Sequence, residues 1–371
     1  MLTLFNFGWP QLSWSLCIAA LYILRTCVSS LWPRTTGKAI VTGSGTAQQS
    51  AIDPNAWISP VRGLDYLQSD PIPYRPYEFQ GHVTMGIQKR KREDWIRLDS
   101  GYLNRIAERK ELIENKPEYT IGTGTLVNDA IEELYNEIMV DYLPKRFPDM
   151  FRVNGKICEN MATKGSYPLD PSILTPAEML RHLGLNVEED FYIMCPDAED
   201  GQFRLRGYIA CFPGGFLSPA RVGESVREIH QPVPGYDEKL GRSVDRYFNR
   251  MVPGDFIGRM NWSLQTDGVD LFRIDGNNFY PGQEDREDFK AKFQPNLDDC
   301  YLRVEHQTLC ALPKSRAIIF CVRSYMTSLH DIRRNGEGPK LADAIESMPE
   351  KLAEYKMVPY WGNIILPWLR S

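Results

Sequence analysis

The sequence predicts an α+β protein in which helices come first and a mostly antiparallel sheet with inserted helices follows. Apolar residues recur at helical spacing up to about residue 183. From residue 191 onward the pattern changes to short apolar or alternating runs, which are typical of strands. Of the 371 residues, 43% are hydrophobic and 25% are charged, which is the balance of a soluble globular protein with a sizeable core.

An apolar segment precedes this body, and we interpret residues 1–35 as a single-pass membrane anchor that contains an apolar helix. Its apolar stretch runs from Leu12 to Leu24 and, after an interruption at Arg25, continues from Cys27 to Trp32, which is near the lower limit of the roughly 20 residues that span a bilayer. Three tryptophans lie at its edges, as interfacial anchors would: Trp9, Trp14 and Trp32. No Lys or Arg precedes Arg25, whereas Arg34 and Lys38 follow it, so the positive-inside rule predicts a cytosolic body. A cleaved signal peptide lacks its basic start here, and a hydrophobic helix that packs on the body is a third interpretation.

Residues 36–60 are rich in Gly, Ser, Thr, Ala and Pro and have the composition of a flexible linker. The GSGT sequence at Gly43 resembles a phosphate loop only superficially, because no Lys-Ser or Lys-Thr follows it. We expect residues 61–371 to form one domain.

Three helices are predicted early in this domain. Helical spacing of apolar residues covers 95–113 and 126–142, and a capping box of Thr175 and Glu178, with Pro176 at the first helical position, starts the third. The elements expected after them are strands at Phe191–Met194 and Phe203–Phe212, helices at Ser218–His230 and Leu240–Phe248, strands at Phe256–Gln265, Tyr301–Leu309 and Ala317–Tyr325, and a C-terminal helix at Leu341–Tyr355.

Composition and motifs exclude several classes of function. A net charge of -5 argues against nucleic acid as a partner, since nucleic-acid binding favours a basic surface. None of the eight cysteines is spaced as C-x-x-C, which argues against zinc ribbons and iron–sulfur clusters. The G-x-S-x-G, H-E-x-x-H and G-x-G-x-x-G motifs of common enzyme families do not occur.

Of the five histidines, His230 has the setting that most favours a metal ligand. It is predicted at the end of a helix, and the following Gln231–Pro234 segment holds the chain in an extended path. The alternative is an imidazolium that satisfies the helix carbonyls. Cys211 is a weaker candidate ligand, because its apolar neighbours indicate a buried strand position.

Two strands alternate in a way that collects polar side chains on one face. In Phe256–Gln265, Arg259 and Asn261 share a face, which meets either solvent or a polar pocket. In Tyr301–Leu309, Glu305 and Gln307 likewise share a face. The strand after it is strongly apolar but contains Arg323, which needs a buried partner. Glu305 on the neighbouring strand is the partner that we expect.

The pieces between Glu189 and Tyr325 resemble the haem-dependent oxidative N-demethylase alpha-subunit family. The resembling sequences are EDFYIM, CFPGGFLSPARVGESVREIHQPVPGY, RMNWSLQ and VEHQTLCALPKSRAIIFCVRSY, and the likeness covers roughly residues 70–335. His306 departs from the pattern, because the family commonly has Arg at this position. The resemblance therefore gives His306 no role as the essential ligand.

The resemblance implies a PAS-like domain, an antiparallel sheet that holds haem b against helices. It implies that His230 is the proximal iron ligand and that Arg259 and Asn261 line the oxygen-side pocket. Residues at the haem edge, or in structural contacts near it, would be Arg323, Glu305 and Gln307. The implied enzyme is a monooxygenase that uses oxygen and electrons from a separate reductase to demethylate a small amine or to oxidise a metabolite in a biosynthetic pathway. A non-catalytic haem sensor or carrier is the alternative, and a haem-free structural protein is the third.

Overall fold

The computed structural model describes residues 58–76, 85–215, 219–274 and 294–371. The predicted anchor at 1–35 and nearly all of the linker at 36–60 therefore lie outside the described residues. None of the helices in the described ranges has both the length and the apolar character needed to cross a bilayer.

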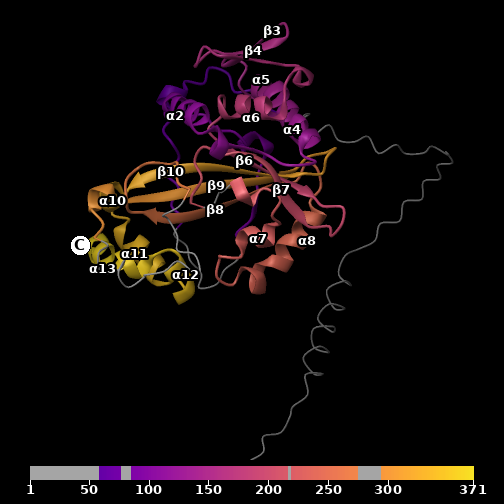
Figure 1. The fold of residues 1–371 in the computed structure, drawn as a ribbon. Coiled ribbons are helices and arrows are strands. Elements are labelled where there is room, and N and C mark those ends of the chain that lie inside the picture. Colours follow the sequence, from indigo (N-terminus) through magenta and orange to yellow (C-terminus); the bar gives the residue numbers. More distant parts are fainter. Residues whose placement is uncertain (1–57, 77–84, 216–218, 275–293) are drawn as a thin grey trace, which may run out of the picture. The chain divides into compact units, whose positions relative to one another are not determined.

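A seven-stranded sheet occupies the centre of the domain (Figure 1), and all its neighbouring strands are antiparallel. The strand order is β1-β8-β9-β10-β6-β7-β2. The strands are β1 (Gln88–Lys89), β2 (Ile121–Thr123), β6 (Asp190–Pro196), β7 (Phe203–Ile209), β8 (Phe256–Gln265), β9 (Tyr301–Ala311) and β10 (Ile318–Ser328). The predicted α+β class and the five predicted strands are confirmed. A small second sheet, β3 (Phe151–Asn154), β4 (Ile157–Asn160) and β5 (Ser166–Pro168), was not predicted.

Helices cover both faces of the sheet. Figure 1 shows α2, α4 and α6 above it in this view, and α7, α8 and α12 below it. The helices are α2 (Tyr102–Asn115), α3 (Pro117–Thr120), α4 (Asn128–Tyr135), α5 (Leu143–Arg146), α6 (Pro176–Gly184), α7 (Val226–His230), α8 (Arg242–Arg250), α10 (Leu329–Arg334), α11 (Gly338–Glu346), α12 (Glu350–Tyr355) and α13 (Val358–Arg370).

Several of the predicted helices differ from the observed ones, and the helix predicted over 95–113 begins only at Tyr102. The helix predicted over 126–142 continues α4 as a π-helical turn at Asn136–Tyr142. α7 begins at a capping box of Ser225 and Glu228, later than predicted. The predicted C-terminal helix is interrupted between α11 and α12, because Pro349 precludes the helical conformation of the residue before it.

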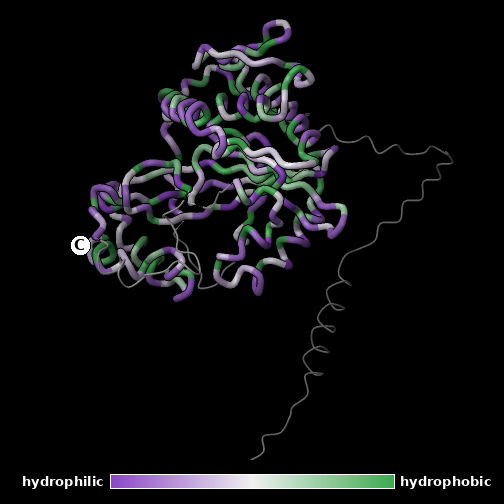
Figure 2. The backbone as a smooth tube through the Cα atoms, viewed as in Figure 1, coloured by the Kyte–Doolittle hydropathy of each residue, from purple (hydrophilic) through white to green (hydrophobic). Residues whose placement is uncertain are grey.

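Apolar side chains of the strands pack on both layers of helices. Figure 2 shows stretches of hydrophobic residues, in green, along the middle of the sheet. One cluster joins α2, α4 and α6 to the face that carries Cys310 and Cys321. A second joins α7 and α8 to the face that carries Ile257 and Leu309. The third packs α10–α13 against the far end of β8 and β9.

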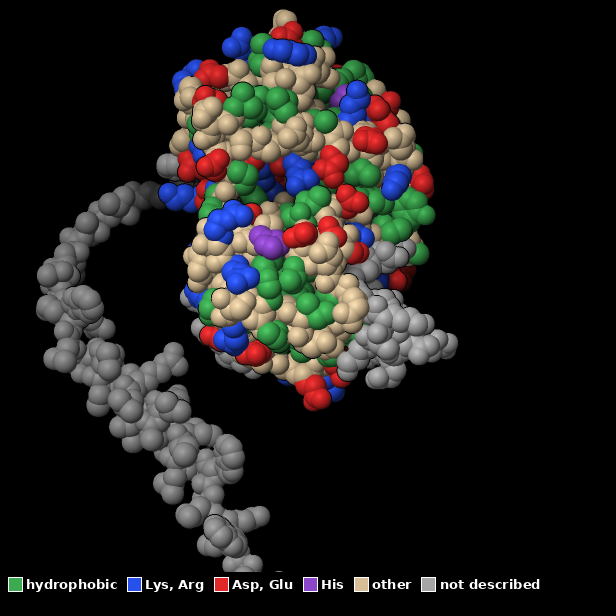
Figure 3. Space-filling view, turned by 90° about the vertical axis from the view of Figure 1, so that its left-hand side faces the viewer, with side chains coloured by type: hydrophobic (Ala, Val, Ile, Leu, Met, Phe, Trp, Pro, Cys, Tyr) green, Lys and Arg blue, Asp and Glu red, His purple; other side chains and the backbone are tan. Residues whose placement is uncertain are grey.

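On the face in Figure 3, acidic and basic side chains are interspersed over the surface.

Arg109 of α2 ties the upper layer of helices to the sheet. Its fully buried guanidinium donates from Nε to the carbonyl of Gly184 (2.9 Å) and from the terminal nitrogens to those of Glu188 (3.0 Å) and Glu189 (3.1 Å). It also pairs with Asp190 at 2.5 Å. Asp190 in turn accepts the backbone N–H groups that follow β7, those of residues 211 and 212, at 2.8 Å each. One guanidinium therefore joins a helix, the start of β6 and the end of β7.

Replacing Arg109 should destabilise the protein strongly. Arg109→Met leaves the Asp190 carboxylate and three carbonyls buried without this donor, so we expect a loss of about 3–5 kcal/mol in the free energy of unfolding. Urea denaturation followed by circular dichroism measures it. Arg181→Met, which removes a solvent-exposed pair with Glu114, should cost no more than ~1 kcal/mol. Equal losses in the two variants would contradict this role of Arg109.

Candidate functional site

The candidate site lies on the face of β8 and β9 that packs toward α7. Residues directly opposite each other in an antiparallel ladder share a face. Arg259 faces Gln307 and Asn261 faces Glu305 in this ladder, so the four predicted polar side chains do lie on one face. Ile257 and Leu309, on the same face, contact the cluster that contains Val226 of α7.

His230 is the last residue of α7, as predicted. Its Nδ1 lies 2.8 Å from the carbonyl oxygen of Val226, and its ring stacks on Tyr236 with the centroids 4.5 Å apart. A carbonyl can only accept, so Nδ1 carries the proton and Nε2 carries the lone pair of the neutral ring. Burial, together with the charges of Arg259 and Arg221, lowers the pKa of His230 to about 4, although the hydrogen bond to Val226 opposes this shift. At neutral pH His230 therefore has the form of imidazole that ligates a metal.

Arg259 is a cation in a largely desolvated position. Burial lowers the pKa of its guanidinium, and the charge of Glu305 opposes that shift. Its Nε is buried and makes no hydrogen bond within the described part of the chain. A buried donor without an acceptor is costly unless a ligand supplies one.

Glu305 is the carboxylate at the centre of this face. It accepts from Asn261 Nδ2 at 3.3 Å and from Gln307 Nε2 at 2.9 Å, and it lies 3.9 Å from Arg303 Nε. A Cβ at Gly214 would stand 2.5 Å from Glu305 Oε1, so any larger residue there would displace the Glu305 carboxylate. The first glycine of the CFPGG sequence thus leaves room for the Glu305 carboxylate.

Lys356, from the end of α12, belongs to the same site and was missed by the sequence analysis. Its Nζ donates to the carbonyl of Trp262 on β8 at 2.6 Å. Burial lowers the pKa of Lys356 to about 8; the carboxylate of Glu305 opposes this and the charge of Arg259 adds to it. Its sequence position gives no signal, because a lysine at the end of an amphipathic helix normally faces water.

The expected pairing of Arg323 with Glu305 is wrong. Glu305 lies opposite Ser324 in the ladder of β9 and β10. Arg323, the residue before Ser324, therefore points to the opposite face of the sheet from Glu305. There it contacts Asp99 (2.6 Å), Glu188 (2.7 Å), Glu189 (3.3 Å) and the carbonyl of residue 97. A contact with a ligand on the Arg259 face is not open to it. Arg323 is a structural cation, the alternative left open by its sequence.

Two other residues considered from the sequence also lie away from this face. His306 pairs across the ladder with Arg323, is 5% exposed and stacks on Tyr74. Burial, together with the charges of nearby arginines, lowers its pKa to about 4. Burial raises the pKa of the Cys211 thiol to about 12, so it is not a thiolate at neutral pH.

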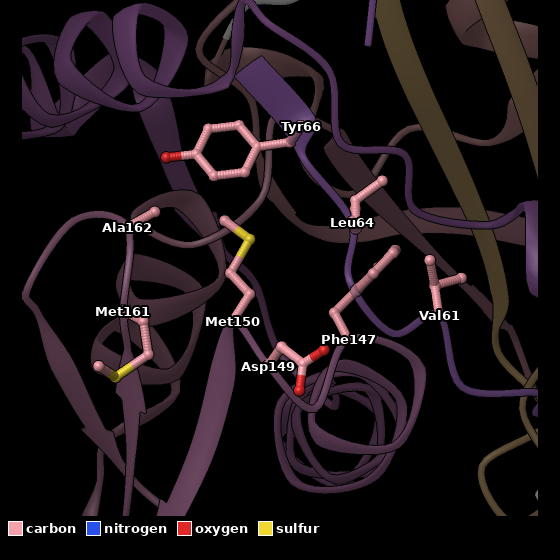
Figure 4. Close-up of a pocket in the computed structure, with 8 residues that line it drawn as sticks. All are labelled: Val61, Leu64, Tyr66, Phe147, Asp149, Met150, Met161 and Ala162. Carbon is pink, nitrogen blue, oxygen red and sulfur yellow. The ribbon is translucent and has the colours of Figure 1, made fainter. Parts of the chain in front are cut away.

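Neither of two cavities among the described residues includes a predicted site residue. One, of about 160 Å³, is lined by residues of the 61–66 segment and of the small sheet region (Figure 4): Val61, Leu64, Tyr66, Phe147, Asp149, Met150, Met161 and Ala162. The other, of about 140 Å³, lies between the β6–β7 turn and α8. Both are smaller than the roughly 300–1,000 Å³ of typical small-molecule sites. In the described ranges, no three His, Cys, Asp or Glu side chains converge as ligands of a free metal ion.

Residues 86–366 match the sequence model of the family described as haem-dependent oxidative N-demethylase, alpha subunit-like. The matched region contains the whole seven-stranded sheet, α7 and Lys356.

The carboxylates around Arg323 should make the stability of the protein depend on pH. Burial raises the pKa of Glu188 to about 7; Arg323 opposes this, and Asp99 and Glu189 add to it. The pKa of Glu188 is therefore higher in the folded than in the unfolded protein. Its contribution to the free energy of unfolding is fully present below about pH 4.3, where the carboxyl is protonated in both states, and is lost as the pH rises to about 7. Glu188→Gln should remove this loss, so its stability relative to wild type should rise by on the order of 1–3 kcal/mol between about pH 5 and about pH 8. Urea titrations at both pH values measure it, with the exposed Glu346→Gln as the control. A constant difference between wild type and Glu188→Gln would contradict the raised pKa.

Proposed function

The chain belongs to the haem-dependent oxidative N-demethylase alpha subunit-like family, and we propose that it is a haem-dependent oxidoreductase that binds haem b through His230. The observation that carries this proposal is the state of His230: a neutral ring, with its Nδ1 proton held by the carbonyl of Val226. Histidines that ligate metals almost always donate their other ring N–H in this way.

The residues on the β8–β9 face fit this cofactor. Haem needs one axial ligand from the protein, and His230 is in the correct protonation state to be that ligand. Haem also carries negatively charged carboxylates, and Arg259 supplies a partly buried positive charge whose Nε makes no hydrogen bond in the described residues. No group of several metal-ligating side chains is required, because the porphyrin supplies the remaining ligands.

When bound, the haem supplies the oxygen and electron-transfer chemistry, which no amino-acid side chain provides. The chain's own residues hold and tune the site. His230 is fixed in rotation by Val226 and Tyr236. Arg259 supplies a positive charge beside Glu305. Asn261 and Gln307 hold the carboxylate of Glu305 in place, where it partly balances Arg259.

The topology supports a PAS-like interpretation of this fold. The strand order β7-β6-β10-β9-β8 places the first and last strands of the core side by side at its centre. The helices α7 and α8 are inserted between β7 and β8 and cover one face. We propose that this domain, residues 61–371, is attached to a membrane through residues 1–35, faces the cytosol and receives electrons from a separate reductase.

The proposed reaction is oxidative N-demethylation of an amine or a related oxidation of a metabolite. For demethylation, an N-methyl amine, oxygen, two electrons and two protons would give the demethylated amine, formaldehyde and water. Equimolar formaldehyde release and oxygen consumption, measured with a reductase system and secondary or tertiary methylamines, test it. Haem binding without oxygen consumption with any such amine would favour the sensor or carrier instead.

His230→Gly should remove the axial ligand and leave a space that fits imidazole. We expect the haem-reconstituted variant to lose the Soret position of the wild type and to recover it when imidazole is added, because free imidazole can replace the missing ring. Absorption spectra measure both effects. His330→Gly, which alters a solvent-exposed histidine, should keep the wild-type spectrum. A His230→Gly spectrum identical to that of the wild type would overturn the assignment of the ligand.

A further inference from the structure

Positive charge exceeds negative charge on the β8–β9 face. Three cations surround Glu305: Arg259 from β8, Arg303 from β9 and Lys356 from α12. Glu305 is the carboxylate whose charge acts on all three. The other acid near Arg303 is Asp190, which is already paired with Arg109. Arg303 is buried and Arg259 and Lys356 are partly buried, so the excess positive charge is unfavourable unless a ligand brings negative charge.

The terminal nitrogens of Arg303 and the carboxylate of Glu305 are hydrogen-bonded to protein groups, whereas Arg303 Nε makes no hydrogen bond in the described residues and lies 3.9 Å from Glu305 Oε1. Arg303 donates to the carbonyls of Phe212 (2.7 Å) and Leu271 (3.2 Å). Glu305 accepts from Asn261 and Gln307. These two residues therefore form a fixed frame.

Arg259 and Lys356 retain donors that this frame does not use. Arg259 Nε has no hydrogen-bond acceptor among the described residues. Lys356 donates one hydrogen bond, to the carbonyl of Trp262, whereas an ammonium group carries three donors. The Trp262 ring lies 5.9 Å from Lys356 Nζ, which holds the ammonium beside β8. Lys356 is hydrogen-bonded to the strand that carries Arg259, three residues further along it, and the carboxylate of Glu305 acts on the charges of both residues.

We propose that Arg259 and Lys356 bind the propionate carboxylates of the haem. Lys356 is therefore a cofactor-binding residue contributed by the C-terminal helices, on the same side of the sheet as α7 (Figure 1). This inference rests on the proposed haem function. It adds Lys356 to the site and identifies the haem propionates as the anions that balance the excess positive charge.

Haemin and haemin dimethyl ester, in which both carboxylates are esterified, separate this proposal from the function on which it rests. The full chain, freed of haem, is titrated with each compound, and affinity is read from the Soret band. We expect the wild type to bind haemin about tenfold or more tightly than the ester, which is the effect of ~1.4 kcal/mol. Lys356→Met should lose about tenfold in affinity for haemin and change little for the ester, whereas Lys356→Arg should keep the preference. Lys351→Met, on the exposed side of α12, is the matched control and should behave as the wild type.

The pH dependence of haemin binding provides a second readout. Lys356 faces Arg259 of β8 and Glu305 of β9, and its pKa in the protein without ligand is about 8. A bound carboxylate favours the ammonium form, so the affinity for haemin should fall as the pH rises above about 8. In Lys356→Arg this fall should disappear, because guanidinium stays protonated.

Each failure has its own signature. A wild type that gives no Soret band with either compound refutes the haem function. A wild type that binds haemin and its ester equally well, with Lys356→Met unchanged for both, leaves the function standing and overturns the role of Lys356. In that case the cations would serve an anionic substrate, and Lys356→Met would raise the KM for carboxylate-bearing amines instead.

Discussion

The hydrogen-bonded register of β8, β9 and β10 determines which polar side chains can meet. Along a strand, side chains alternate between faces, so a shift of one residue would exchange them completely. In the observed register Arg259, Asn261, Glu305 and Gln307 face the helix that ends in His230. The same register sends Arg323 and His306 to the other face. The site on one face and the ion-pair network on the other are thus two consequences of one alignment.

The two faces hold opposite excesses of charge. Around Arg323, three carboxylates meet one guanidinium, and burial raises the pKa values of Glu188 and Glu189. Around Glu305, three cations meet one carboxylate. A buried carboxylate can lose its negative charge by binding a proton, but a guanidinium cannot lose its positive charge at neutral pH. The β8–β9 face that carries Arg259 would therefore be stabilised more by an anionic ligand, and this is the face on which we propose that haem binds.

Much of this arrangement could be predicted from local sequence patterns. Alternation gave the strands and placed Arg259 with Asn261, and the proline-rich exit placed His230 at a helix end. Properties that depend on distant parts of the chain were not accessible. The partners of Arg323 depend on register, and Lys356 reaches the site only because α12 packs near β8. The interruption at Pro349 was open to prediction, since proline restricts the residue before it.

The position of β10 has a consequence for how the protein is made. It is the last of the seven strands along the chain, yet it lies between β9 and β6 in the middle of the sheet. Until a ribosome has delivered it, the β6–β7 hairpin and the β8–β9 pair have no strand to join them. Each would present an open, largely apolar edge to other nascent chains. Products of early termination or of frameshifts upstream of Ile318 should accordingly become clients of chaperones and proteases, whatever the strength of their individual hairpins.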